Sequence, residues 1–247
     1  MIDFHCHLDL YKDSISLLSD VKKRCKFVLA VTTSPRAWEK TSQVFSSIDC
    51  ISVGLGLHPE ILEKKINERE LFFFSLPKSQ YIGEIGLDGT TRNKYSLDIQ
   101  VEFFTEVIKA SEKIGGRVIS IHSRSAVKST LEIIEKNINA SISVMHWFSG
   151  TDKEIDKAIS MNCWFSVNPL MLSSKKGISL IKKVALTKMI PETDGPFTTH
   201  EGVQYMPWDT EIVIEGIARL KNIIKDDVSK VMLENKKILC ANAKTIT

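Results

Sequence analysis

Short runs of almost unbroken apolarity, rich in Val, Ile and Phe, alternate along the chain with longer segments that have helical spacing. An apolar run without the polar positions of a half-exposed strand is typical of a parallel strand covered on both faces. Eight such runs are predicted as strands, at 1–7, 26–32, 50–57, 80–87, 117–122, 141–146, 162–167 and 188–192.

The segments between these runs have the periodicity of amphipathic helices. The clearest, 97–114, carries Leu97, Val101 and Ile108 along one face and ends at a glycine pair, which favours helix termination. Further helices are predicted at 37–48, 126–138, 153–160, 209–220 and 225–243.

Eight strand–helix repeats in 247 residues favour a single (β/α)₈ TIM barrel with an extra C-terminal helix. An open, doubly wound sheet has the same alternation, so periodicity alone leaves both architectures open. Because no linker or low-complexity tract interrupts the chain, residues 1–247 are expected to form one domain.

Composition is that of a globular protein, with 43% hydrophobic and 26% charged residues. The 33 basic and 30 acidic side chains give a net charge of only +3, too small to indicate a surface built for polyanions. The five cysteines are scattered without a C-x-x-C pair, so neither a disulfide framework nor a zinc ribbon is predicted. The chain has no signal-like start and no membrane-length apolar run, so we expect a cytoplasmic protein without a membrane partner.

Ionisable side chains gather at the carboxyl ends of the predicted strands, where barrel enzymes carry their catalytic groups. Six of them, from five strands or the residues just after, are His5, His7, Glu84, His122, His146 and Asp194. Burying so many ionisable groups together is costly unless a cation holds them. Imidazoles and carboxylates without a thiolate favour Zn²⁺, Mn²⁺ or Mg²⁺, and six ligands suffice for two ions about 3.5–4 Å apart.

Each of these residues also has a simpler interpretation. An H-x-H pair arises by chance in roughly one sequence in seven of this length and composition. A histidine at a strand end is more often a hydrogen-bonded structural residue, and Glu84 could be a buried acid paired with arginine. The convergence of all six on one end of a barrel is what favours a metal centre.

Strand parity makes a more local prediction for the first strand. His5 and His7 are two residues apart and should share one face, with Phe4 and Cys6 on the other. If the histidines face the barrel axis, Cys6 packs outward beneath the helices as a core thiol and is not a ligand.

Five short motifs follow one another along the chain: FHCHLD at 4–9, GEIGLD at 83–88, IHSR at 121–124, HWFSG at 146–150 and ETDGP at 192–196. Together they resemble the signature motifs of the TatD family of metal-dependent deoxyribonucleases, which are amidohydrolase-like barrels. More narrowly, TTSPRAWE at 32–39 and Trp147 resemble the TatD-type component of the Qat anti-phage defence system, which implies other Qat-system proteins as partners.

The resemblance implies two divalent metal ions that share a carboxylate. One ion would be held by His5, His7, Glu84 and Asp194, and the other by Glu84, His122 and His146. Asp194 would also take the proton from the attacking water, so Glu84 and Asp194 are the catalytic candidates.

Two further residues are candidates for substrate contacts. Arg124 follows His122 by two residues and could hold a phosphate in bidentate fashion, or it could be a surface arginine near a helix start. His58, before Pro59 at the end of the third predicted strand, could equally contact substrate or be a turn residue.

Two segments depart from the family pattern and leave the substrate open. Residues 89–91 are GTT where many relatives have aromatic residues, and 200–208 replace the usual features after the eighth strand. Replacement stacking surfaces could come from Trp147, Phe148, Tyr205 and Trp208, although aromatic residues beside strand ends more often pack.

The features together favour a two-metal nuclease that hydrolyses DNA phosphodiester bonds, acting 3′ to 5′ on single-stranded or frayed ends, in anti-phage defence. The modest net charge argues against tight duplex binding, but not against a pocket that takes one strand end. The same chemistry could serve an ester or amide hydrolase, such as an aminoacyl-tRNA deacylase. A largely structural subunit of a defence complex is disfavoured because all six candidate ligands are present.

Overall fold

The computed structural model describes residues 1–244 and contains a sheet of eight parallel strands in the order β1 to β8. Each strand pairs with the next strand in the chain, and each lies within one of the predicted runs. The strands are β1 (Ile2–Cys6), β2 (Phe27–Val31), β3 (Ile51–Leu55), β4 (Tyr81–Gly86), β5 (Val118–His122), β6 (Ile142–Met145), β7 (Trp164–Val167) and β8 (Met189–Pro191).

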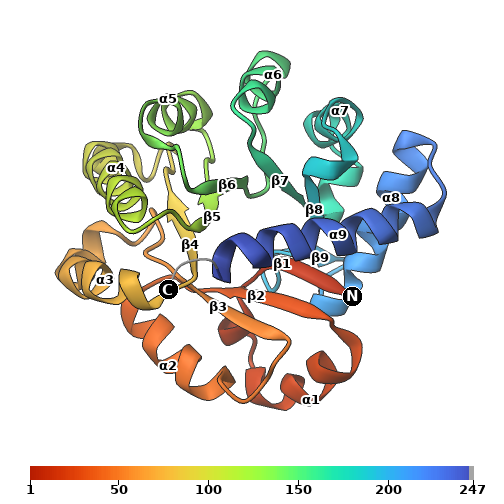
Figure 1. The fold of residues 1–247 in the computed structure, drawn as a ribbon, viewed down its shortest axis with the longest axis horizontal. Helices are drawn as coiled ribbons and strands as arrows, with labels where there is room; N and C mark the ends of the chain where they lie inside the picture. The colour runs from red at the N-terminus through yellow and green to blue at the C-terminus, as the bar shows by residue number, and fades with distance from the viewer. Residues whose placement is uncertain (245–247) are drawn as a thin grey trace.

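Helices surround this sheet, and a final helix crosses one end of it (Figure 1). The α-helices are α1 (Ser14–Arg24), α2 (Pro35–Phe45), α3 (Arg69–Ser75), α4 (Leu97–Lys113), α5 (Val127–Asn137), α6 (Asp152–Ser160), α7 (Lys175–Lys183), α8 (Glu211–Lys221) and α9 (Lys225–Lys244). Short 3₁₀ helices occupy Leu8–Leu10, Glu63–Glu68, Leu76–Lys78, Lys94–Ser96, Pro169–Leu172, Leu186–Lys188 and Pro207–Thr210, and β9 (Thr199–His200) pairs with β10 (Val203–Gln204).

The helix starts follow the local sequence. The hydroxyl oxygen of Ser34 accepts a hydrogen bond from the backbone N–H of Ala37, and Pro35 occupies the first turn of α2. Thr151 and Glu154 form a reciprocal capping box at α6. These caps satisfy amide groups that the first turn of a helix leaves free, and they fix where each helix leaves its strand.

The seam between β8 and β1 decides between a barrel and an open sheet. The N–H of Asp194 donates to the carbonyl of His5 at 2.9 Å, and the N–H of His7 donates to the carbonyl of Gly195 at 2.8 Å. The buried Asp3 carboxylate accepts the N–H of Thr193 at 3.0 Å. Because backbone hydrogen bonds join the last strand region to the first, the predicted TIM-like barrel with a C-terminal helix is confirmed.

The barrel interior is divided between an apolar floor and a polar rim. The floor is built from residues near the starts of the strands and from Leu239 and Ala243 of α9, so α9 closes the amino-terminal end. The opposite end carries the loops that follow each strand. No helix among residues 1–244 is long and apolar enough to cross a membrane.

The parity predicted for β1 is right for Cys6 and wrong for Phe4. Cys6 packs outward with Val21 of α1, as expected. Phe4, however, packs in the floor cluster, with its ring 5.5 Å from that of Phe27. The register with β2 shifts between Asp3 and Cys6, and this irregularity breaks the strict alternation of the strand.

Candidate metal centre

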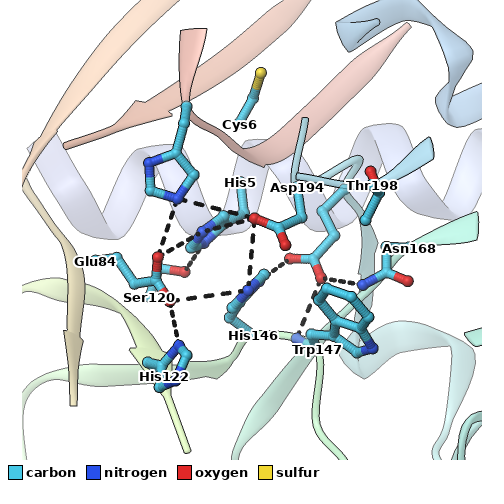
Figure 2. Close-up of polar contacts among 12 residues, drawn as sticks. His5, Cys6, Glu84, Ser120, His122, His146, Trp147, Asn168, Asp194 and Thr198 are labelled. Carbon is cyan, nitrogen blue, oxygen red and sulfur yellow. Dashed lines mark hydrogen bonds and ion pairs between the residues drawn. The ribbon is translucent and has the colours of Figure 1, made fainter. Parts of the chain in front are cut away.

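Six buried or nearly buried side chains converge at the carboxyl-terminal rim of the barrel (Figure 2). They come from five strands or the residues directly after them: His5, His7, Glu84, His122, His146 and Asp194. The structure therefore brings together, at one rim, the whole set of ligands predicted from the sequence.

Glu84 occupies the centre of the cluster, and its two oxygens face different histidines. Oε2 lies 3.0 Å from Nε2 of His7 and 3.4 Å from Nε2 of His5. Oε1 lies 2.5 Å from Nδ1 of His122 and 3.9 Å from Nε2 of His146. A carboxylate that presents one oxygen to each pair of imidazoles has the geometry needed to bridge two neighbouring cations.

Asp194 faces three of these four histidines. Its Oδ1 atom lies 3.7 Å from Nε2 of His5, 3.8 Å from Nε2 of His7 and 3.8 Å from Nε2 of His146. The residue adopts a φ of 57°, a left-handed conformation that few non-glycine residues take, while its N–H is held by β1. The backbone after β8 thus directs this carboxylate into the cluster.

The donor set fits a cation on two observations. Within the part of the chain that the structure describes, Nε2 of His5 and Nδ1 of His7 are buried without a hydrogen-bond partner. Several donor pairs are 3.4–3.9 Å apart, too far for hydrogen bonds. Two ligand atoms bonded to one ion at about 2.1 Å are separated by about 3.4 Å in tetrahedral geometry. These longer pairs therefore have the spacing of atoms arranged around an ion.

Outer groups fix the far nitrogen of three histidines. Nε2 of His122 lies 3.0 Å from Oδ2 of Asp88, and Nδ1 of His146 lies 2.8 Å from Oε2 of Glu192. Nδ1 of His5 lies 2.7 Å from the hydroxyl of Ser120. Partners of this kind set the tautomer of a ligating histidine and leave its other nitrogen free for the metal.

The roles of Asp88, Glu192 and Ser120 were not predicted from the sequence. Asp88 and Glu192 appeared only as letters within motifs, although each is an acid at the end of an apolar strand. Glu192 also lies two residues before Asp194, a spacing that could have indicated a shared direction. Ser120 lacked any signal of this kind.

The segment at 89–93, which includes the GTT at 89–91 noted in the sequence, supports Asp88. The N–H of Thr90 donates to Oδ1 of Asp88 at 2.9 Å, and Nδ2 of Asn93 donates to the same atom at 3.0 Å. Oδ2 is left for His122. The loop therefore has an identifiable structural role in orienting a histidine of the centre.

A cavity of about 610 Å³ opens onto the cluster and contains both predicted substrate residues. His58 lies in contact with the centre, with Nε2 3.3 Å from Oε1 of Glu84. Its Nδ1 accepts the N–H of Glu60 at 3.1 Å, which leaves the proton of a neutral ring on Nε2. The Arg124 side chain also lines the cavity and makes no hydrogen bond or ion pair within residues 1–244.

A family model for TatD-related DNases matches residues 2–240, nearly the whole chain. The chain belongs to this family. The TatD-family resemblance of the five motifs is thereby confirmed, and the narrower resemblance to a Qat component stays a prediction.

Several relatives of this TatD-family chain cover 90% or more of its length. An uncharacterized metal-dependent hydrolase of Buchnera aphidicola (strain APS) is 28% identical over 249 residues, covering 90% of this chain and 92% of that protein. Human deoxyribonuclease TATDN3 is 28% identical over 257 residues, covering 95% and 92%. The solved TatD homologue YJJV of Escherichia coli K12 has a TM-score of 0.82 at 20% identity, covering 97% of both chains, which shows the shared fold.

Two histidines of this TatD-family centre are strongly biased towards the protonated form. Burial lowers the pKa of His122, but the carboxylates of Glu84 and Asp88 outweigh burial and raise it to about 9. Burial likewise disfavours protonated His146, but Glu192 raises its pKa to about 10. Without metal, these protons supply the positive charge that the carboxylates require.

The other members of the cluster divide by burial and by neighbouring charge. Burial and the charge of His146 lower the pKa of His5 to about 3, so this ring is neutral and ready to bind a cation. Burial opposes ionisation of Glu84, yet the neighbouring histidines hold its pKa well below the usual value. Burial raises the pKa of Asp194 to about 7, which suits a proton acceptor at neutral pH.

These shifts predict that the metal-free protein loses stability as the pH rises. The folded pKa values of His122 and His146, about 9 and 10, exceed the ordinary 6.5, so their contribution is complete below pH 6.5 and is lost through pH 9–10. In chelator, the melting temperature should fall by at least about 3 °C between these limits, or roughly 1 kcal/mol at this chain length. Saturating metal should suppress the fall, since the cation replaces the protons. A flat profile in chelator would contradict the proposed protonation.

Replacing Asp88 with asparagine should weaken metal binding by about 10–100-fold. Thr90 and Asn93 both donate to Oδ1, so the new amide would turn its NH₂ group towards Nε2 of His122. That histidine would then carry its proton on Nδ1, the nitrogen that faces Glu84. Competition with a fluorescent chelator measures the affinity, with the exposed Asp98→Asn in α4 as a control that should bind like wild type.

Proposed function

We propose that this protein is a two-metal nuclease that removes nucleotides from DNA, acting 3′ to 5′ on single-stranded or frayed ends in the cytoplasm. The observation that carries the proposal is the guanidinium of Arg124, which lines the cavity that opens onto Glu84 and has no partner among the described residues. A free cation beside a cluster of carboxylates and imidazoles favours an anionic substrate with a hydrolysable centre, and a phosphodiester is such a substrate.

The ligands are assigned by which Glu84 oxygen they face. His5 and His7 share Oε2, His122 and His146 share Oε1, and Asp194 completes the first set. Bound Zn²⁺, Mn²⁺ or Mg²⁺ would supply Lewis acidity to the phosphodiester and would acidify water.

The remaining chemistry belongs to the side chains. Asp194 Oδ1 accepts the proton from the attacking water, since its raised pKa matches the task and it faces both sets of ligands. Arg124 holds phosphate oxygens in bidentate fashion. His58 Nε2–H donates to a phosphate oxygen, because its Nδ1 is already occupied as an acceptor by Glu60.

The choice of DNA and of a strand end rests on separate support. Relatives of similar length include a human deoxyribonuclease, and the family model describes DNases. A cavity of about 610 Å³ has the size of a small-molecule pocket and suits one terminal nucleotide better than a duplex. The net charge of +3 agrees with local phosphate contacts in place of an extended basic surface.

Incubation of the metal-loaded protein with end-labelled oligonucleotides and, separately, with aminoacylated tRNA tests the proposal. Release of mononucleotides from the 3′ label, with single strands preferred over blunt duplex, is the expected result. Deacylation of tRNA without phosphodiester cleavage would replace the nuclease with the ester-hydrolase alternative.

The place of this enzyme in anti-phage defence, with other Qat-system proteins as partners, is the narrower part of the proposal. It is supported by the resemblance of the segment at 32–39, which contains the start of α2, and of Trp147 to the Qat component. Phage plating on cells that carry the full defence locus with wild type or Glu84→Ala tests it. Equal protection against phage by the wild-type and Glu84→Ala loci would show that defence does not depend on this active site.

Arg124→Ala should raise KM for an oligonucleotide by about 10–100-fold, because a charge-assisted hydrogen bond to phosphate contributes about 1.5–3 kcal/mol. Arg124→Lys should recover part of the loss, since it keeps the charge but not the bidentate geometry. Steady-state kinetics measures both, with the exposed Arg219→Ala in α8 as a control that leaves KM unchanged. An unchanged KM in Arg124→Ala would show that the phosphate is held elsewhere.

A further inference from the structure

The wall of the active-site cavity contains two exposed aromatic rings among mostly polar residues. Trp147 and Phe197 both line it, with 36% and 59% of their surfaces exposed. Of the stacking candidates suggested by the sequence, Trp147 alone lines this cavity. Phe148 is buried against Phe165, and the ring of Trp208 is covered by the guanidinium of Arg24 at 4.3 Å.

The position of Trp147 is fixed by the metal centre itself. Its backbone has a φ of 37°, a left-handed conformation that is unfavourable for a bulky residue. The N–H of Trp147 donates to Oε1 of Glu192 at 3.1 Å, and Oε2 of the same carboxylate lies 2.8 Å from Nδ1 of His146. One buried carboxylate thus positions both a candidate metal ligand and the neighbouring indole.

Trp147 and Phe197 lie at opposite ends of a continuous row of rings. The indole meets the His146 ring edge-on at 6.3 Å, and His146 stacks on His5 at 3.6 Å. His5 contacts His7 at 5.3 Å, and His7 meets the ring of Phe197 edge-on at 5.0 Å. The two apolar rings therefore flank the imidazoles that would surround the scissile phosphate.

We propose that Trp147 is a specificity-determining residue, whose indole stacks on the unpaired base adjoining the scissile phosphodiester; this rests on the proposed nuclease function. A planar, apolar face exposed beside an anion-binding arginine matches a ligand that joins a flat ring to a phosphate. In a duplex, base pairing and stacking on neighbours keep a base away from the indole. Trp147 therefore selects single-stranded or frayed ends.

The test compares an oligonucleotide whose terminal nucleotides carry bases with one that has abasic tetrahydrofuran residues at both termini. Wild type should prefer the base-bearing end in kcat/KM by about tenfold, the effect of one stacked base. Trp147→Ala should reduce this ratio to about one, whereas Trp147→Phe should keep most of it. Tyr95→Ala, which removes an 86% exposed ring outside the cavity, should keep the wild-type ratio.

A second measurement does not require cleavage. In chelator, single-stranded oligonucleotide should quench tryptophan fluorescence in wild type, and Trp147→Phe should lose that quench while Tyr95→Ala keeps it. Cleavage without a preference for base-bearing ends overturns the stacking role and leaves the nuclease intact. A Trp147-dependent quench without cleavage of any oligonucleotide overturns the nuclease and leaves the stacking role. If the protein shows neither cleavage nor a fluorescence quench, both the nuclease function and the stacking role are overturned.

Discussion

Glu84→Ala should lose turnover by at least roughly 10³-fold in kcat/KM and should no longer hold two equivalents of metal. Glu84 presents a separate oxygen to each pair of histidines, Oε2 towards His5 and His7 and Oε1 towards His122 and His146. Its removal should therefore affect both proposed metal sites at once, whereas the loss of one histidine should leave the other set of ligands complete.

The fold should survive this substitution. The barrel is held by its strand ladder, by the β8–β1 seam and by the apolar clusters on both sides of the sheet, none of which uses the Glu84 side chain. Far-ultraviolet circular dichroism should match wild type, while elemental analysis after metal loading should show reduced content.

Glu60→Gln is the matched control for Glu84→Ala. Glu60 lines the same cavity, but its carboxylate pairs with Arg92 and faces none of the histidines. The substitution should leave metal content unchanged and kcat within a few-fold of wild type. Turnover at the wild-type rate by Glu84→Ala would refute the shared-carboxylate arrangement, whatever the control does.

The strand–helix alternation could be predicted from the sequence because each strand is covered on both faces and is therefore largely apolar. Runs such as FVLAV in β2 have no polar face to confuse with a helix, and the spacing between runs left room for one helix each. Periodicity alone could not distinguish a closed barrel from an open sheet, because closure depends on a few backbone hydrogen bonds between Asp194, Gly195 and β1. Those bonds join residues 188 and 189 positions apart in the chain.

The candidate ligands could be predicted from the sequence for a related reason. Parallel strands deliver their carboxyl ends to one rim, so an ionisable residue at a strand end can be placed without knowing its neighbours. Phe4 shows the limit of this reasoning, because a register shift in β1 breaks the alternation on which parity depends. The histidines remain at the rim, since their place follows from the end of the strand and not from strict parity.

The hydrogen-bond partners of the candidate ligands could not be predicted from the sequence, because each contact joins two residues that are distant in the chain. Asp88 meets His122, and Glu192 meets His146 and the backbone of Trp147, across different strands. The periodicity of a single strand does not predict a contact between side chains on two different strands. These contacts fix one nitrogen of each histidine and so orient the other nitrogen as a ligand. The orientation of the ligands therefore depends on tertiary contacts, which the sequence pattern does not show.

Asp194→Asn should lower kcat by about 10²–10⁴-fold while keeping part of the metal affinity. The amide oxygen can still face His5, His7 and His146, but it cannot accept the proton of the attacking water. Asp20→Asn, an exposed carboxylate on α1, is the matched control and should leave kcat unchanged.

The pH profile separates proton transfer from metal binding. Burial raises the pKa of Asp194 to about 7 in the metal-free protein, and a nearby cation lowers it again. In metal-loaded wild type, kcat should therefore fall as the pH drops through a value at or below 7, where the carboxylate becomes protonated and cannot act as a base. Asp194→Asn measured at saturating metal should lack that acid limb, because an amide does not titrate there. Full activity of Asp194→Asn across neutral pH would assign the proton acceptor to another group, and an unchanged acid limb in this variant would do the same.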